Sequence, residues 1–344
     1  MIDLPILKKY DPSGMHDVYD RWPEIARESY ESKQDVVDYK NIDHIVFAGM
    51  GGSGALGDIF SAILSKTNIH VAVVKGYNLP NTVDRNTLVV TTSISGNTTE
   101  TLSVLDAANI SKCKVLAFSS GGKMQTYCIK HKIEHRHIHH LHSPRASFPN
   151  FLYTILKVMG SVIPVKKHDI LDSINQLQKS GKEISSENLT EKNSSLSLAR
   201  WVTGIPVIYY PFGLQAAAIR FKNSIQENAK IHAMTEDVIE ACHNGIVAWE
   251  KTDNVKPIFL EGKDDYIKTK ERWKILREYF EANTIEYREI FSVKGSILSK
   301  LINLIYRLDY ASIYKAVLSK VDPTPIRSID FIKEQIGLTR YIKH

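Results

Sequence analysis

Short apolar runs alternate with longer amphipathic segments along most of the chain. The runs are rich in Val, Ile and aromatic residues, and most are followed by Gly, Ser, Asn or Pro. This alternation is typical of βαβ units, in which parallel strands are buried between helices. We therefore predict an α/β fold with doubly wound, mainly parallel sheets flanked by helices. The predicted strands are 44–48, 69–74, 88–92, 115–118, 206–210, 257–260 and 286–290.

A polar stretch at 166–195 interrupts this pattern and contains no strand run. We expect a helix and a connector there, because the alternation begins again at Trp201. The 344 residues suffice for two domains, each with its own core, at about 100 to 200 residues per domain. We place these domains at 1–165 and 166–344, as a loose structural duplication without a sequence repeat.

Charge and cysteine usage narrow the class of protein. The chain has 44 basic and 38 acidic residues, spread along its length, whereas a nucleic-acid arm concentrates its charge. The uncharged stretch 201–219 contains glycines and prolines, which favour a strand, a turn and a helix start over a membrane span. The three cysteines form no CxxC, and the N-terminus lacks a secretory signal. We expect a cytoplasmic protein without nucleic-acid or membrane partners.

A glycine turn, G-M-G-G-S-G at 49–54, follows the first predicted strand. Glycines let backbone amides approach a ligand closely, and the amides at the start of the next helix point at negative charge. A tight turn without a ligand is the alternative. The spacing also fits the dinucleotide motif G-x-G-x-x-G, but Lys75 follows the next strand where an acidic residue is expected, which disfavours a nicotinamide cofactor.

A hydroxyl loop, T-T-S-I-S-G-N-T-T-E-T at 91–101, lies between a predicted strand and a predicted helix. A dianionic phosphate needs many donors, and Ser93, Ser95 and Thr98 supply hydroxyls beside the exposed amides of the helix N-terminus. No lysine follows the glycine, so this is not a P-loop. A helix cap with surplus hydroxyls is the alternative. Both loops follow strands at the carboxyl edge of the sheet, where open α/β sheets bind ligands.

These two loops together resemble the sugar isomerase (SIS) domain, a phosphosugar-binding fold. Motifs elsewhere narrow the resemblance to the archaeal-type bifunctional phosphoglucose/phosphomannose isomerases. They occur in the order of that family and span Phe47 to Lys333. The motifs are S-P-R-A at 143–146, E-N-A-K at 227–230, C-H-N-G at 242–245, D-P-T-P at 322–325 and Lys333.

The resemblance implies an aldose–ketose isomerase of carbohydrate metabolism, acting in glycolysis and gluconeogenesis. It would interconvert fructose 6-phosphate with glucose 6-phosphate and mannose 6-phosphate through a cis-enediol. The subunit would contain two SIS domains and act as a homodimer, without a metal or another cofactor.

The resemblance also implies a role for each motif residue. Glu227 would move the proton between C2 and C1, Arg145 would stabilise the enediolate, and His243 of the partner subunit would assist ring opening. Lys333 would lie near the sugar ring, and Thr324 would act through a water. The phosphate would be held by Gly52, Ser53, Ser93, Ser95 and Thr98.

Helical spacing alone gives Glu227 a different interpretation. On a helix predicted to begin near Phe212, Glu227 lies about 120° from the apolar face, which indicates a solvated glutamate. The proposed chemistry nevertheless suits these residue types, since a carboxylate base contributes about 10² to 10⁴ in rate. A fixed guanidinium stabilises charge that appears only in the transition state.

The chain departs from the family pattern at two places. Gly245 stands where an acidic residue is usual after H-N, and Ser147-Phe148-Pro149 stands where small residues and glycine are usual. Two alternative functions are a non-catalytic phosphosugar sensor and an isomerase of another phosphosugar, such as glucosamine 6-phosphate. Such sensors usually carry a helix-turn-helix domain, and the sequence has no evident basic recognition helix.

Six histidines crowd the segment 131–142. On a strand, His135, His137 and His139 would share one face, so a zinc or nickel site is one hypothesis. A polar strand or loop without a metal is the alternative, and we favour it. The apolar stripe at 297–305 has the spacing of helical core packing.

Overall fold

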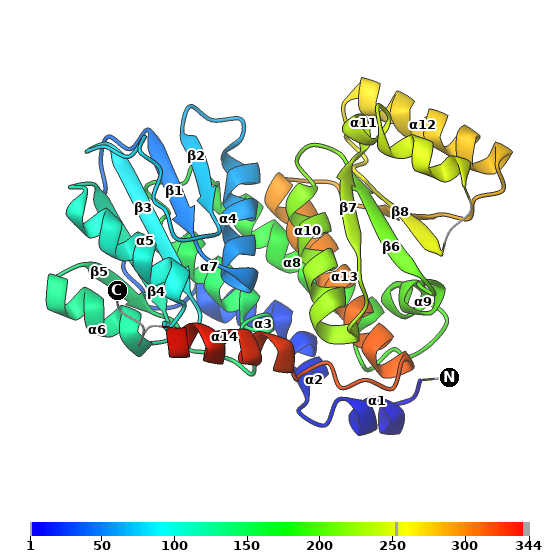
Figure 1. The fold of residues 1–344 in the computed structure, drawn as a ribbon, viewed down its shortest axis with the longest axis horizontal. Coiled ribbons are helices and arrows are strands. Elements are labelled where there is room, and N and C mark those ends of the chain that lie inside the picture. The colour runs from blue at the N-terminus through cyan, green and yellow to red at the C-terminus, as the bar shows by residue number, and fades with distance from the viewer. Residues whose placement is uncertain (1, 252–253, 340–344) are drawn as a thin grey trace.

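The computed structural model describes residues 2–251 and 254–339. Two parallel sheets lie side by side, each with helices packed against it (Figure 1). The predicted α/β fold with mainly parallel sheets is therefore confirmed. The first sheet has the strand order β2-β1-β3-β4-β5. Its strands are β1 (His44–Ala48), β2 (His70–Val74), β3 (Thr87–Ser93), β4 (Lys114–Ser119) and β5 (Glu134–His137).

The second sheet has four parallel strands in the order β7-β6-β8-β9. Each of the seven predicted strands is present, with ends that differ by no more than a few residues. The edge strand β7 was not predicted, and the edge strand β5 lies in the histidine-rich segment, where a polar strand or loop was expected. The strands of this sheet are β6 (Ile205–Tyr210), β7 (Met234–Asp237), β8 (Val255–Glu261) and β9 (Arg288–Phe291).

Helices cover both faces of each sheet because the central strands are apolar on both sides. Ile45 and Phe47 of β1 belong to the main apolar cluster with α4 (Gly51–Leu64), whereas Val46 and Ala48 pack with residues of α5 (Thr99–Ile110). The other helices that precede residue 166 are α1 (Leu4–Tyr10), α2 (Met15–Asp20), α3 (Trp22–Tyr30), α6 (Gly122–His131) and α7 (Phe148–Val158).

The second sheet is covered in the same way. Ile208 of β6 lies in the main cluster, and Val207 packs with Val238 and Phe280 on the opposite face. The helix expected within 166–195 is α8, whereas the domain boundary itself stays a prediction. The helices here are α8 (Lys167–Ile184), α9 (Ser194–Trp201), α10 (Gln215–Ala229), α11 (Val238–Ala241), the 3₁₀ helix η1 (Gly245–Glu250), α12 (Ile267–Ala282), α13 (Ile297–Leu318) and α14 (Arg327–Thr339).

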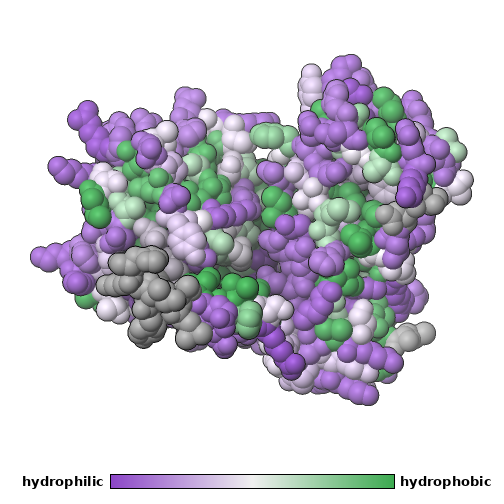
Figure 2. Space-filling view, in the orientation of Figure 1, coloured by the Kyte–Doolittle hydropathy of each residue, from purple (hydrophilic) through white to green (hydrophobic). Residues whose placement is uncertain are grey.

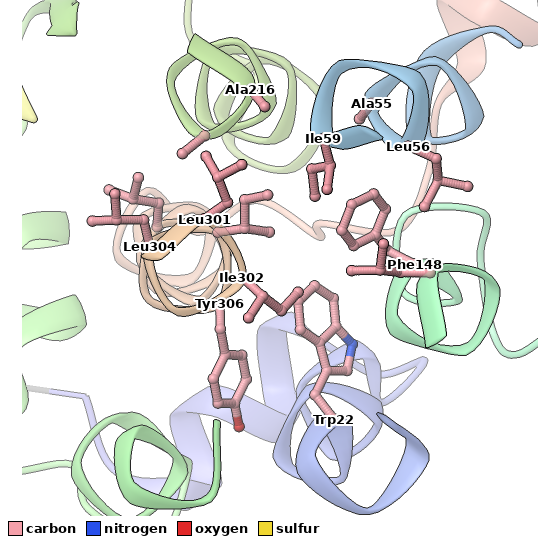
Figure 3. Packing of buried hydrophobic residues seen from close by; sticks show 14 of the residues in the cluster. Trp22, Ala55, Leu56, Ile59, Phe148, Ala216, Leu301, Ile302, Leu304 and Tyr306 are labelled. Atoms are coloured by element: carbon pink, nitrogen blue, oxygen red, sulfur yellow. The ribbon is translucent and has the colours of Figure 1, made fainter. Parts of the chain in front are cut away.

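One apolar core joins the two halves around α13. Figure 3 shows Leu301 and Ile302 of α13 among Ala216 of α10, Ile59 of α4 and Trp22 of α3. The apolar stripe at 297–305 is therefore core packing, as predicted. Because α10 also packs on α4, the last turn of α10 lies near the glycine turn at 49–54. No helix among residues 2–251 and 254–339 has the length and apolar character needed to cross a membrane.

Candidate active site

The glycine turn and the hydroxyl loop lie together at the carboxyl edge of the first sheet. They follow β1 and β3, which are hydrogen-bonded neighbours with Ala48 opposite Thr91. The backbone N–H of Ile94 donates to the Ser53 Oγ over 3.3 Å, which joins the two loops. A Cβ at Gly49 would lie 2.9 Å from the Thr92 carbonyl oxygen, so this close approach requires glycine.

The hydroxyls expected to bind phosphate surround the N-terminus of α5. The Ser93 Oγ and the Thr98 Oγ1 are hydrogen-bonded at 2.9 Å, and the Ser95 Oγ accepts from the Asn97 N–H over 3.3 Å. Thr98 precedes the first helical residue, but its side chain makes no cap hydrogen bond. The alternative of a simple helix cap therefore does not account for this loop. The loop also needs Gly96, because a Cβ there would overlap the Gly121 carbonyl oxygen.

Arg145 is buried between the two halves of the chain and is 4% exposed. Its Nε donates to the Asn228 Oδ1 over 2.7 Å, and its NH1 donates to the Glu227 Oε2 over 3.1 Å. Its NH2 donates to the carbonyl oxygens of Pro323 and Thr324, over 2.6 and 3.0 Å. The D-P-T-P segment thus fixes the guanidinium through its backbone. Asn228 and these two carbonyls are contacts that the motifs did not reveal.

Glu227 lies in the last turn of α10, and its side chain is 27% exposed. The interpretation of a solvated glutamate, which rested on helical spacing alone, holds only in part, because the partly exposed carboxylate is paired with the buried Arg145. Lys230 follows one turn later and donates to the Glu227 carbonyl oxygen. Burial and then the nearby Arg145 lower the pKa of Lys230.

A cleft of about 770 Å³ opens beside this ion pair. Ligand sites typically measure about 300–1,000 Å³, so the volume suits a small metabolite. The walls come from the glycine turn, from the end of α10 and from the segment that leads into α14. Gly51, Glu227, Lys230, Asp322 and Ile329 are among the lining residues.

Further predicted site residues are Thr324, Lys333 and His243. The Thr324 Oγ1 is buried and has no hydrogen-bond partner among the described residues. Lys333 is exposed on α14, one turn beyond Ile329 of the cleft wall. His243 is exposed after α11 and does not line the cleft. Within one chain the structure therefore brings Glu227 and Arg145 together but leaves His243 apart.

The structure shows the contacts made at both departures from the family pattern. A Cβ at Gly245 would overlap the Glu236 Oε2, so a side chain there would require the Glu236 carboxylate to move. Burial raises the pKa of Glu236. The Ser147 Oγ donates to the Leu141 carbonyl oxygen over 2.7 Å, which closes the loop that carries Arg145.

The histidine-rich segment begins at the last residue of α6 and continues through β5 into the loop that follows it. The His135 Nε2 is hydrogen-bonded to the Ser119 Oγ at 2.8 Å, and burial lowers the pKa of His135. Within residues 2–251 and 254–339, no group of three or more His, Cys, Asp or Glu side chains is arranged to hold a metal ion. The zinc or nickel hypothesis therefore finds no support in the described part of the chain.

Two family models match the chain in succession. The SIS domain matches residues 38–150, and the bacterial phospho-glucose isomerase C-terminal SIS domain matches residues 191–336. A solved structure, a glucose-6-phosphate isomerase like protein from Thermus thermophilus, superimposes with a TM-score of 0.63 at 16% identity. The match covers 97% of this chain and 99% of that one, and it shows the fold alone.

Curated relatives match over almost the full length. A bifunctional phosphoglucose/phosphomannose isomerase from Caldicellulosiruptor bescii is 32% identical, covering 92% of this chain and 96% of the relative. The protein of that name from Aquifex aeolicus is 29% identical, covering 92% and 94%. A D-glucosamine-6-phosphate 4-epimerase from Sulfolobus acidocaldarius is 25% identical, covering 93% and 97%. With two SIS domains and 32% identity over most of its length, the chain belongs to the family of bifunctional phosphoglucose/phosphomannose isomerases.

Proposed function

We propose that the protein interconverts fructose 6-phosphate with glucose 6-phosphate and with mannose 6-phosphate. The observation that carries this proposal is the Glu227 carboxylate, which lines a cleft together with Gly51 of the glycine turn and is paired at 3.1 Å with the buried Arg145 guanidinium. The names of the relatives support these substrates. The reaction is an isomerisation, so it needs no external oxidant or reductant.

In this proposal Glu227 is the base and Arg145 stabilises the intermediate. The carboxylate takes the proton from C2 of the aldose, and the C–H electron pair forms the C1–C2 double bond of a cis-enediol. Negative charge then develops on the former carbonyl oxygen, where a fixed cation stabilises it. Returning the carbon-bound proton to C1, while the O2 hydroxyl proton passes to O1, gives the ketose. Returning it to C2 gives an aldose, and rotation about the C2–C3 bond of the enediol lets the same carboxylate serve both faces of C2 and so give either aldose.

The hydrogen bonds of Arg145 leave it one donor for the substrate. A guanidinium has five N–H groups. The Nε uses one, the NH1 uses one and the NH2 uses two, which are four in all. The remaining N–H belongs to NH1, the nitrogen that contacts Glu227. In this proposal the base and the electrophile act from neighbouring atoms.

The phosphate would bind at the two loops of the first sheet. Helices α4 and α5 begin there without a side-chain cap, so their first amides are available to an anion. We assign the dianion to the amide of Gly52 and to the hydroxyls of Ser53, Ser93, Ser95 and Thr98. In this proposal the phosphate binds at one end of the substrate and C2 lies at Glu227.

His243, Lys333 and Thr324 complete the site in the proposed homodimer. His243 is exposed and outside the cleft of its own chain, which supports a role in the site of the partner subunit. The buried Thr324 Oγ1, which lacks a partner among the described residues, supports a bound water, since buried hydroxyls are normally hydrogen-bonded. We place Lys333 near the sugar ring.

Exposed apolar side chains support a second subunit. Figure 2 shows apolar residues at the surface over α14, where Phe331 and Ile332 are 58% and 55% exposed. Val247 of η1, near His243, is 59% exposed. Large exposed apolar groups often mark protein interfaces. Cys113, Cys128 and Cys242 are free, which supports the proposed cytoplasmic location.

A coupled assay with fructose 6-phosphate tests the function. We expect both glucose 6-phosphate and mannose 6-phosphate to form, and we expect Glu227→Gln to lower kcat at least about 10²-fold because the base is lost. Glu278→Gln is a matched control, since Glu278 is an exposed helical glutamate paired with Lys274.

Three outcomes would contradict the proposal. Full activity of Glu227→Gln would exclude this carboxylate as the base. A melting-temperature shift with fructose 6-phosphate but no turnover would favour the non-catalytic sensor. Turnover with amino-sugar phosphates alone would favour the isomerase of another phosphosugar.

A further inference from the structure

A buried ion pair lies directly behind the Arg145 loop. Arg220 of α10 and Asp309 of α13 are 2% and 0% exposed. The Arg220 Nε donates to both carboxylate oxygens over 3.3 and 3.0 Å, and the NH2 donates to the Oδ2 over 2.7 Å. Asp309 also accepts from the Ser224 Oγ over 2.6 Å and from the Tyr19 OH over 3.1 Å. Its charge is thus fully hydrogen-bonded within the core.

Arg220 connects this pair to the main chain of Arg145. The Arg220 NH2 also donates to the Arg145 carbonyl oxygen over 2.8 Å, and its guanidinium lies over the Phe148 ring at 4.4 Å. The NH1 lies 3.5 Å from where a Cβ of Gly52 would be. Arg220 therefore contacts the Arg145 segment and approaches the glycine turn.

A second connection reaches the side chain of Arg145 from the same helix. The Asn228 Oδ1 accepts from the Arg145 Nε, and the Asn228 Nδ2 donates to the Ser312 Oγ over 2.8 Å. Ser312 and Asp309 both belong to α13, and the Ser312 Oγ donates to the Asp309 carbonyl oxygen. Helix α13 thus fixes Arg145 twice, at its carbonyl through Arg220 and at its Nε through Asn228.

A buried ion pair is weak evidence of a gain in stability. Apolar residues of similar volume are often as stabilising, because burying two charges removes them from water. What directional hydrogen bonds add is orientation, and orientation within about 1 Å changes reaction rates strongly. The hydrogen bond from Arg220 ends at the Arg145 carbonyl oxygen, so the group that is oriented is the main chain of Arg145.

We propose that Arg220 and Asp309 are positioning residues for the isomerisation. They hold the main chain at residue 145 so that the Arg145 guanidinium meets Glu227 with one N–H free for the substrate. This inference rests on the proposed isomerase function. Neither residue contacts the reacting carbons in this arrangement, so the effect of each depends on Arg145.

A double-mutant cycle tests that dependence. The cycle compares kcat for fructose 6-phosphate in the wild type, Arg220→Met, Arg145→Met and the double variant, each per folded protein. We expect Arg220→Met to lower kcat about 10²-fold with a nearly unchanged KM, since misplacement of one group has that effect. We expect the double variant to be no slower than Arg145→Met alone, because Arg220 then has nothing to position.

Additive losses in the double variant, or full kcat in Arg220→Met, would overturn the inference. A wild type without turnover would instead overturn the proposed function, so the two failures are distinguishable. If Arg220→Met does not fold, Asp309→Asn and Arg220→Lys replace it in the same cycle, since both keep the side-chain volume.

A control variant on the same helix distinguishes a positioning role from a merely structural one. Asn303 of α13 is also fully buried and donates to the Ser180 Oγ over 2.6 Å, away from the Arg145 loop. We expect Asn303→Leu to lower the melting temperature without changing kcat per folded protein or the ratio of the two aldose products. We expect Arg220→Met to change both kcat and that ratio. An equal effect of both variants on kcat would overturn the inference.

Discussion

Replacing Arg145 by methionine keeps much of the apolar stem but removes four hydrogen bonds. Three partners are uncharged acceptors, the Asn228 Oδ1 and the carbonyl oxygens of Pro323 and Thr324. Each buried acceptor left without a donor costs about 1–3 kcal/mol. The Pro323 carbonyl oxygen still accepts from the Lys230 Nζ over 3.4 Å, so two acceptors lose their donor. Because Thr324 is only half-buried, we use the lower value and expect a loss of about 2 kcal/mol in the free energy of unfolding.

The same substitution removes the cation that faces the developing negative charge. Loss of one such donor typically lowers kcat by about 10²- to 10³-fold. Arg145→Lys is the informative intermediate, because one ammonium cannot reach the carboxylate, the amide and two carbonyls together. We expect its stability loss to be smaller than that of methionine and its kcat to remain low.

Urea unfolding and the coupled assay measure these two effects separately. A methionine variant that keeps the wild-type unfolding free energy would show that the hydrogen bonds to residues 323 and 324 do not hold this segment. A methionine variant with kcat within a few fold of the wild type would refute the role of Arg145 in stabilising the enediolate.

Two further predictions concern the hydroxyl loop and the pH dependence of stability. Gly96 has a φ of +67° and its Cβ would overlap the Gly121 carbonyl oxygen, so we expect Gly96→Ala to raise the KM for fructose 6-phosphate at least about tenfold. Gly76→Ala, which meets no atom within 4 Å, should leave the KM unchanged. Burial alone would lower the pKa of His16, but its hydrogen bond with Asp11 raises that pKa above 6.5. The resulting stabilisation is fully present below pH 6.5 and is lost as pH rises through the raised pKa. His16→Asn should therefore lower the unfolding free energy more at about pH 5.5 than at about pH 8.5, and an equal loss at both would contradict the reasoning.

Strands that are buried on both faces were predictable from their apolar runs. Two strands had no apolar run by which to predict them, β5 with the sequence E-H-R-H and β7 with M-T-E-D, and each lies at the edge of its sheet. An edge strand pairs on one side only and can be polar throughout, so its sequence carries no apolar period. Their place in the sheet comes from tertiary pairing with β4 and β6.

The two loops of the candidate site and its motifs could be predicted from the sequence. The glycine turn and the hydroxyl loop meet because parallel neighbouring strands end at one edge, a rule that needs no side-chain detail. The contacts of Arg145 with Asn228, Pro323 and Thr324 were not predicted, because the motifs that contain these residues do not show which groups meet in space. One signal was present but not used, namely the acidic Asp309 within the apolar run L-I-N-L-I-Y-R-L-D-Y of α13. A charge in such a run predicts a buried partner.

Helix α13 has a consequence for how the protein moves. It is buried along almost its whole length, between α10 on one side and α8 and α9 on others, and it contacts α4 of the first half. The two sheets therefore cannot swing apart about a hinge without exposing the apolar interior that they share. Heat should melt both halves in a single transition. The segment 321–329, which belongs to neither sheet, forms one wall of the cleft beside Glu227.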